Sequence, residues 1–183
     1  EAAEIDILGD AYEYMIGQFA AGAGKKAGEF YTPQEVSQIL AEIVITGKTR
    51  LKSVYDPTCG SAGMLISCIA YLKDKKQEWR NVKVFGQEII PPTASICRMN
   101  MFLHGVDDAV IWQGDTLSNP GNIENDKLMK FQCIVANPPF SLDKWDSGFL
   151  GDVSESGKKA KMSADLDPYK RFDWGIPPVS KGD

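Results

Sequence analysis

Four consecutive residues in the last third of the chain have the chemistry to bind an amino group. Asn137-Pro138-Pro139-Phe140 directly follows the apolar run at 133–136. The two prolines fix the backbone and hold the asparagine extended. An exocyclic amino nitrogen of a base is a poor nucleophile and needs acceptors for its two N–H bonds, which the Asn137 side-chain oxygen and the Pro138 carbonyl could supply. Phe140 could stack on a base flipped out of a duplex, whereas a proline-stiffened turn is the plainer alternative.

A second stretch has the composition of a ligand-binding loop. Its sequence is Asp56-Pro57-Thr58-Cys59-Gly60-Ser61-Ala62-Gly63. Small residues, here Gly60, Ser61, Ala62 and Gly63, let the backbone approach a ligand closely where a helix begins. A carboxylate at the strand end suits a ligand that carries an ammonium group, such as the methionine end of S-adenosylmethionine. A plain strand-to-helix turn fits the same residues equally well.

Two further acidic residues follow the next two predicted strands. Glu88 lies 25 positions after Gly63 (88 − 63), close to the roughly 20-residue offset at which an acidic residue reaches ribose hydroxyls in nucleotide-binding folds. Asp115, followed by Thr116 and Leu117, could accept a hydrogen bond from the adenine amino group of a cofactor. A surface glutamate and a turn aspartate are the alternatives.

Alternating elements would position these motifs. The patterns predict helices over 5–19, from Gln34 to about Thr46, from Ser61 to about Lys75 and from Pro91 to about His104, with strands over 53–55, 82–87, 109–113 and 133–136. Thr32 is predicted to cap the second helix, with Pro33 as its first residue. This order is typical of an α/β fold with a parallel sheet, whose ligands bind at the carboxyl ends of the strands. The apolar run at 133–136 predicts a strand covered on both faces.

The first predicted helix has apolar residues on one face. They are Ile5, Leu8, Tyr12, Met15, Ile16 and Phe19. This spacing predicts that the helix packs through that face.

Composition bounds the function. With 183 residues and 43% hydrophobic side chains, the chain suits one globular domain. We expect a cytoplasmic protein with no membrane contact, because no apolar run approaches a membrane span and the acidic opening does not resemble a signal peptide. The net charge of −5 argues against binding nucleic acid by electrostatics alone. The lysines of 73–76 and 158–161 are interpreted as solvated surface.

Cysteine usage indicates buried, reduced thiols. Cys59, Cys68, Cys97 and Cys133 form no C-x-x-C pair, and His104 is the single histidine. We therefore predict neither a metal site nor a disulfide framework.

Taken in order, the motifs resemble the modification subunit of type I restriction-modification systems, the adenine-N6 DNA methyltransferases. The resemblance covers about residues 5–183. It rests on Gly28-Glu29-Phe30-Tyr31-Thr32-Pro33, the 56–63 loop, Gly86-Gln87-Glu88, Arg98-Met99-Asn100 through His104-Gly105, Asn137-Pro138-Pro139-Phe140, and Arg171-Phe172 with Gly175-Ile176-Pro177-Pro178.

The resemblance implies a Rossmann-like fold that binds S-adenosyl-L-methionine. It implies cofactor contacts from the loop 29–34 near the methionine portion, namely Glu29, Phe30, Tyr31, Thr32, Pro33 and Gln34. The 56–63 loop and Glu88 carry over as further contacts. Ala62 stands where relatives often have glycine, a small change that we expect to leave cofactor binding intact.

The resemblance also implies a larger assembly. The sheet of the family continues beyond the Asn-Pro-Pro-Phe strand, so we expect a fragment truncated after the fourth strand, which would then be an apolar edge. We expect N-terminal helices and a cofactor-capping loop in residues 1–50, the binding and catalytic core in 51–140, and a long polar loop near the active site in 141–183. DNA, a specificity subunit and a motor-bearing restriction subunit are the implied partners.

Two other functions remain open from the sequence. A protein-glutamine methyltransferase needs the same two acceptors, although those enzymes resemble an Asn-Pro-Pro-Tyr pattern, and Phe140 with the Phe-Tyr-Thr-Pro loop favours DNA. A truncated module that binds the cofactor without catalysis is the second alternative.

Overall fold

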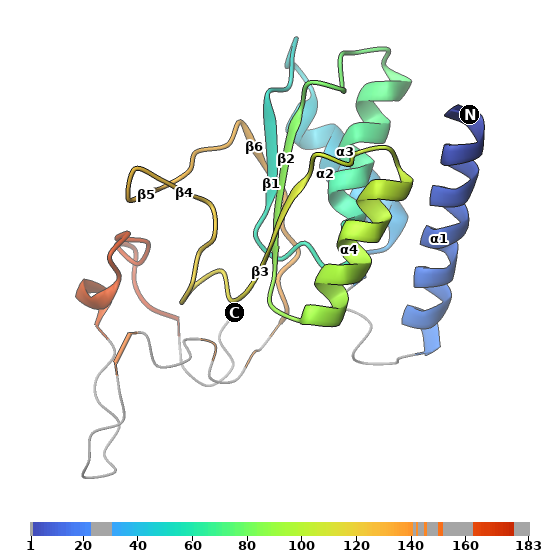
Figure 1. Ribbon diagram of the computed structural model, residues 1–183. Coiled ribbons are helices and arrows are strands. Elements are labelled where there is room, and N and C mark those ends of the chain that lie inside the picture. The colour runs from blue at the N-terminus through green and yellow to red at the C-terminus, as the bar shows by residue number, and fades with distance from the viewer. Residues whose placement is uncertain are drawn as a thin grey trace.

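A four-stranded parallel sheet forms the centre of the molecule. The computed structural model describes residues 2–22, 31–140, 142, 145, 150–151 and 163–177. The strands β1 (Ser53–Asp56), β2 (Lys83–Glu88), β3 (Val110–Gln113) and β6 (Cys133–Ile134) lie in the order β3-β2-β1-β6 (Figure 1). All three pairings are parallel. The predicted α/β fold is confirmed, and the carboxyl ends of the strands therefore share one edge.

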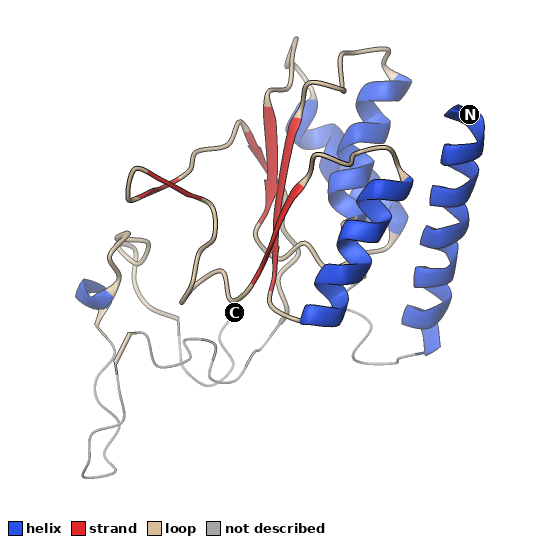
Figure 2. Cartoon of the chain, in the orientation of Figure 1, coloured by secondary structure: helices blue, strands red, loops and turns tan. Residues whose placement is uncertain are grey.

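Helices cover one face of this sheet. α2 (Gln34–Ile45), α3 (Gly63–Asp74) and α4 (Pro91–Leu103) lie on that side, with α1 (Ala2–Gly22) outside α4 (Figures 1 and 2). Side chains that point toward the helices are buried in the core, and they include Val54, Val84, Ile111 and Cys133. Burial of such a contiguous apolar cluster is the main stabilising contribution to the sheet's position.

The opposite face of the sheet is exposed, although the sequence predicted that the strand at 133–136 is covered on both faces. Within the described residues no helix lies on it (Figure 2). Ile134 is 55% exposed and Trp112 is 48% exposed, so the prediction of a strand covered on both faces at 133–136 is wrong. Only Cys133–Ile134 forms the strand, at the edge of the sheet. Phe131 partly fills this face by stacking on Tyr55, with ring centroids 4.5 Å apart.

The first helix forms as predicted, but of the described residues on its predicted apolar face only Ile16 is buried and Tyr12 half-buried. Leu8, Met15 and Phe19 are exposed, whereas Ile16 and Ala20 are buried. The face through which α1 packs contains Gly9, which lies against the His104 ring. A side chain at this position would not fit, because its Cβ would be only 2.8 Å from that ring. Helices approach closely where a residue has no side chain, and periodicity of large apolar residues does not detect this.

One helix cap and one helix start differ from the predictions. α2 begins at Gln34 as predicted, but Pro33 is its N-cap residue and Thr32 gives it no side-chain cap, because the Thr32 hydroxyl accepts from Asn137. α3 begins at Gly63 and not at Ser61, because Ala62 has a left-handed backbone with φ of 74°. This conformation favours glycine, so glycine would fit the backbone at this position without strain.

Two small elements were not predicted. The strands β4 (Ile123–Glu124) and β5 (Lys127–Leu128) form an antiparallel hairpin. Asn125 and Asp126 turn it with φ of 51° and 59°, the positive pair that a two-residue hairpin requires. A short 3-10 helix, η2 (Ala164–Leu166), lies in the segment for which no periodicity was found.

Candidate cofactor and catalytic site

The 56–63 loop surrounds a buried carboxyl group. Asp56 ends β1 and is 0% exposed. Its Oδ1 accepts a hydrogen bond from the Thr58 backbone N–H at 2.9 Å, and its Oδ2 has no partner. Burial raises the pKa of Asp56 to about 7, against the Thr58 hydrogen bond, and the nearby Glu88 raises it further. The Asp56 carboxyl group thus fixes the turn at the start of the loop through its hydrogen bond with Thr58.

Glu88 holds the same loop from the neighbouring strand. Its Oε2 accepts from the Gly60 N–H at 3.0 Å, and its Oε1 accepts from the Ile90 N–H at 2.8 Å. Burial raises the pKa of Glu88, although the N–H groups that it accepts from favour its charged form. Each carboxylate oxygen retains a second lone pair for a ligand hydroxyl. The two predicted motifs are therefore joined directly.

The loop after β3 meets the 56–63 loop. The Thr116 hydroxyl donates to the Pro57 carbonyl. Asp115 closes its own turn, because its Oδ1 accepts from the Leu117 N–H at 2.9 Å and its Oδ2 accepts from the Ser118 hydroxyl at 2.8 Å. Asp115 thus has the geometry of the turn aspartate, and its role toward adenine stays a prediction.

The Asn-Pro-Pro-Phe segment reaches the same edge. The Val135 N–H donates to the Tyr55 carbonyl at 3.0 Å, which extends the pairing of β6 with β1 toward Asn137. Asn137 Nδ2 donates to Thr32 Oγ1 at 3.2 Å, so the side-chain oxygen is the atom left to accept from a ligand. Phe140 is 84% exposed, as a stacking surface for an incoming base must be.

A polar cavity of about 500 Å³ adjoins these segments. It lies between α1 and the N-terminal ends of α2 and α3. Its lining includes Asp10, Glu13, Thr32, Gln34, Ser37 and Gly63. Ser37 is only 1% exposed and its hydroxyl has no hydrogen-bond partner. Buried polar atoms are usually hydrogen-bonded, so the Ser37 hydroxyl offers a hydrogen bond to a ligand or water in this cavity.

Of the predicted cofactor loop, Tyr31, Thr32 and Gln34 line this cavity, and Pro33 precedes α2 beside them. Glu29 and Phe30 lie outside the described residues, as do the lysines of 158–161.

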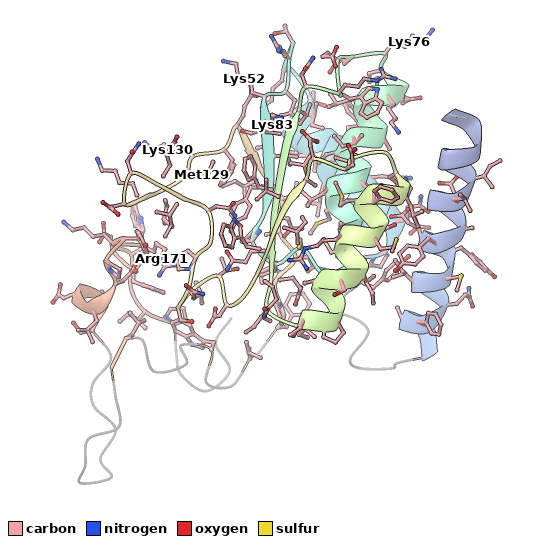
Figure 3. The ribbon with its side chains drawn as sticks, viewed as in Figure 1. Lys52, Lys76, Lys83, Met129, Lys130 and Arg171 are labelled. Atoms are coloured by element: carbon pink, nitrogen blue, oxygen red, sulfur yellow. The ribbon has the colours of Figure 1, made fainter. Side chains whose placement is uncertain are left out.

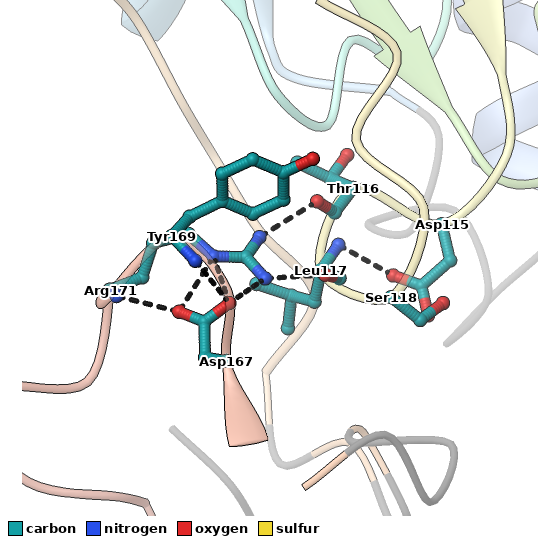
Figure 4. Close-up of polar contacts among 7 residues, drawn as sticks. All are labelled: Asp115, Thr116, Leu117, Ser118, Asp167, Tyr169 and Arg171. Carbon is teal, nitrogen blue, oxygen red and sulfur yellow. Dashed lines mark hydrogen bonds and ion pairs between the residues drawn. The ribbon is translucent and has the colours of Figure 1, made fainter. Parts of the chain in front are cut away.

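The segment 163–177 is anchored to the loop after β3 (Figure 4). Arg171 Nη2 lies 2.8 Å from Asp167 Oδ1, and the side chain of Asp167 is 0% exposed. The same guanidinium donates to the carbonyls of Thr116 and Leu117 at 3.2 and 2.7 Å. Arg171 therefore ties a distant part of the chain to predicted cofactor contacts.

Buried amides complete the framework and were missed as individual predictions. Gln87 is buried, and its Nε2 donates to the Asn119 carbonyl at 2.9 Å while its Oε1 accepts from the Gly121 N–H at 3.0 Å. Asn100 Nδ2 donates to the Ser61 carbonyl at 2.9 Å. The sequence signal for these two amides is a polar residue within an otherwise apolar strand or helix pattern.

The basic side chains labelled in Figure 3 lie largely away from this edge. Lys52 precedes β1, Lys83 begins β2 and Lys76 follows α3, so they project from the amino ends of the strands (Figure 3). Lys83 pairs with Asp108 at 2.9 Å. The described carboxyl edge is thus not a lysine-rich surface.

The four cysteines are buried and unpaired, as predicted. Cys59 Sγ lies 3.5 Å from Cys97 Sγ. Across the described ranges, no group of three or more histidine, cysteine or acidic side chains is arranged to hold a metal. None of the helices seen in those ranges combines the length and apolarity needed to cross a membrane.

Comparison with known proteins places the chain in a family. A family model described as N-6 DNA Methylase matches residues 3–181. The methylase subunit of the type I restriction enzyme MpnII from Mycoplasma pneumoniae is 41% identical over 174 residues, which cover 91% of this chain and 30% of that protein.

Solved structures share the fold. The methyltransferase subunit of a type I restriction-modification system from Streptococcus thermophilus aligns with a TM-score of 0.73 at 35% identity, covering 96% of this chain and 34% of that one. A putative class I S-adenosylmethionine-dependent methyltransferase from Listeria monocytogenes aligns with a TM-score of 0.64 at 17% identity, covering 97% of this chain and 53% of that one. This chain spans about a third of the length of the type I proteins it matches. It has the α/β fold of S-adenosylmethionine-dependent methyltransferases, and it belongs to the N-6 DNA methylase family.

Proposed function

We propose that this chain carries the cofactor-binding and catalytic segment of an adenine-N6 DNA methyltransferase, as part of the modification subunit of a type I restriction-modification system. The hydrogen bond from Asn137 Nδ2 to Thr32 Oγ1 carries the proposal. It joins the segment expected to hold the target amino group to the loop expected to hold the cofactor. The names of the relatives support the type I assignment.

The cofactor residues have complementary roles in this proposal. The backbone of residues 60–63, which carries only small side chains, lets the ligand approach closely, and Asp56 holds the start of this loop through the Thr58 N–H. Glu88 accepts the ribose hydroxyls through its remaining lone pairs. Asp115, Thr116 and Leu117 border the adenine, and Tyr31 to Gln34 border the methionine portion. When bound, S-adenosylmethionine supplies an electrophilic methyl group.

The polar cavity fits this ligand. Its hydroxyl and amide lining, and the unpartnered Ser37 hydroxyl, suit an amino-acid group better than an apolar one.

The catalytic residues act on the target base. The Asn137 side-chain oxygen and the Pro138 carbonyl accept the two N–H bonds of the adenine amino group, which concentrates electron density on its nitrogen as transfer proceeds. Pro138 and Pro139 keep these acceptors rigid, because proline fixes φ. Thr32 fixes the Asn137 amide so that its oxygen faces the base. Phe140 stacks on the flipped adenine.

We also propose the wider organisation. Residues 51–140 form the core, 1–50 the N-terminal helices and capping loop, and 141–183 a loop beside the active site, in support of which Arg171 anchors to Thr116. DNA is the substrate, read with a specificity subunit, and a motor-bearing subunit carries out restriction. A cytoplasmic location follows from this substrate.

Asn137→Ala tests the proposal in the full-length modification subunit assembled with its specificity subunit. We expect labelled-methyl transfer to DNA to be lost, because one of two N–H acceptors is gone, while S-adenosylmethionine binding persists. Asn81→Ala, in the exposed turn before β2, is the control and should transfer normally. Equal activity of the Asn137 variant and the parent would overturn the assignment. Methylation of a glutamine-containing protein in place of DNA, or cofactor binding without any transfer by the parent, would favour the rival functions.

A further inference from the structure

We propose that α1 forms a wall of the cofactor site and that Glu13 accepts the α-ammonium group of the cofactor's amino-acid end. This inference rests on the proposed function, because it names the part of S-adenosylmethionine that the cavity holds. The cavity lies between α1 and the starts of α2 and α3, next to Thr32, which also bonds the catalytic asparagine.

The charge of the cavity favours a cation on the α1 side. Asp10 and Glu13 line it from α1, and among the residues that the structure describes none of those lining the cavity is lysine or arginine. A carboxylate in a partly desolvated pocket attracts an ammonium group more strongly than it would in water. The α1 wall thus matches the positive end of an amino acid.

The opposite wall favours an anion. α2 and α3, each 12 residues long, begin at this cavity with Gln34 and Gly63. Helix N-termini present backbone N–H groups and a partial positive charge, which stabilise a carboxylate. The unpartnered Ser37 hydroxyl, buried at 1% exposure, gives a second and independent observation, because it offers a hydrogen bond to a polar ligand. Both charges of a zwitterion therefore have a counterpart here.

Glu13 is better placed than Asp56 for the ammonium group. Asp56 is fully buried behind its loop, whereas Glu13 lines the open cavity and is only partly buried. Asn100, whose Nδ2 donates to the Ser61 carbonyl at 2.9 Å, is near enough to Glu13 to act against the rise that burial causes in the pKa of this carboxyl. A single buried amide thus lies between Glu13 and the 56–63 loop.

The test compares two ligands by calorimetry on the full-length modification subunit. S-adenosylmethionine carries the amino-acid end, and 5′-methylthioadenosine lacks it. Glu13→Gln keeps the shape of the side chain but removes its charge. We expect S-adenosylmethionine to bind about tenfold to a hundredfold more weakly, in line with the loss of a charge-assisted hydrogen bond, and methylthioadenosine to bind unchanged.

Glu35→Gln removes an exposed carboxylate of α2 that does not line the cavity and should leave both affinities unchanged. Unchanged S-adenosylmethionine affinity in Glu13→Gln, or equal weakening of both ligands, would overturn the role of Glu13. Failure of the unmodified subunit to bind either ligand would instead overturn the proposed cofactor, and the inference with it.

Discussion

The pH dependence of stability should report on Asp56. The carboxyl is 0% exposed and its Oδ2 has no partner, so ionisation leaves a charge in a place without water. Burial accordingly raises its pKa from 3.8 to about 7. A group with a raised folded-state pKa contributes stability below its unfolded-state pKa and loses it as the pH rises through the folded-state value.

The size of this loss follows from the pKa. Between pH 5 and about 7, the unfolded chain has ionised Asp56 while the folded chain retains the proton. Each such pH unit lowers the free energy of unfolding by about 1.4 kcal/mol, so the loss by pH 8 is roughly 3 kcal/mol. Asp56→Asn mimics the protonated acid, since an amide oxygen can still accept from Thr58. The variant should lack this loss.

Urea unfolding of the parent chain and of Asp56→Asn at pH 5 and pH 8 measures the difference. Carboxyl groups with a shifted pKa that do not interact with Asp56, such as Glu13 and Asp167, titrate in both chains and cancel in the comparison. Equal pH dependence of the two chains would refute the reasoning. Saturating S-adenosylmethionine adds a second test, because the loss should persist if Glu13 holds the ammonium and should shrink if Asp56 does.

Three further substitutions probe the framework. Gly86→Ala should cost about 1–3 kcal/mol in urea unfolding, because its Cβ would lie 2.9 Å from Cys59 Sγ; unchanged stability would contradict the packing. Arg171→Ala leaves Asp167 buried without its cation, so hydrogen exchange over 163–177 should rise, and exchange equal to that of the parent would count against the anchor. Thr32→Val should slow methyl transfer about tenfold, because it removes the hydroxyl that positions Asn137. Thr32→Ser keeps the hydroxyl and should transfer at the parent rate. Equal rates for the two variants would show that this hydrogen bond does not contribute to catalysis.

The order of the elements could be predicted from sequence because it depends on local patterns. Strands alternating with helices indicated the parallel sheet, and the acidic and small residues at the strand ends indicated its ligand edge. The loops that these residues form are joined by the Gly60–Glu88 and Asn137–Thr32 bonds. Gly60, Glu88 and Asn137 could be assigned to this edge from their positions after predicted strands, whereas Thr32 was placed near the cofactor only by the family resemblance.

The remaining features depend on partners far apart in the chain. The packing face of α1 is set by Gly9 against His104, and a pattern of large apolar residues gives no weight to a glycine. The exposed Ile134 could not be predicted either, because an apolar strand looks the same whether one face or both are covered. Thr32 looked like a helix cap, since spacing does not tell whether its hydroxyl has a better partner elsewhere.

The two carboxylates at the ends of β1 and β2 have different roles even though both are buried. Glu88 accepts backbone N–H groups through both oxygens, which compensates part of its desolvation and holds the Gly60 backbone in place. Asp56 has one such bond and one unpartnered oxygen, so it remains the more costly group to ionise. A bound cation near the 56–63 loop would relieve that cost. A stabilisation by S-adenosylmethionine that grows with pH in the parent chain but not in Asp56→Asn would show that the ammonium group lies near Asp56, and would favour Asp56 over Glu13 as its partner.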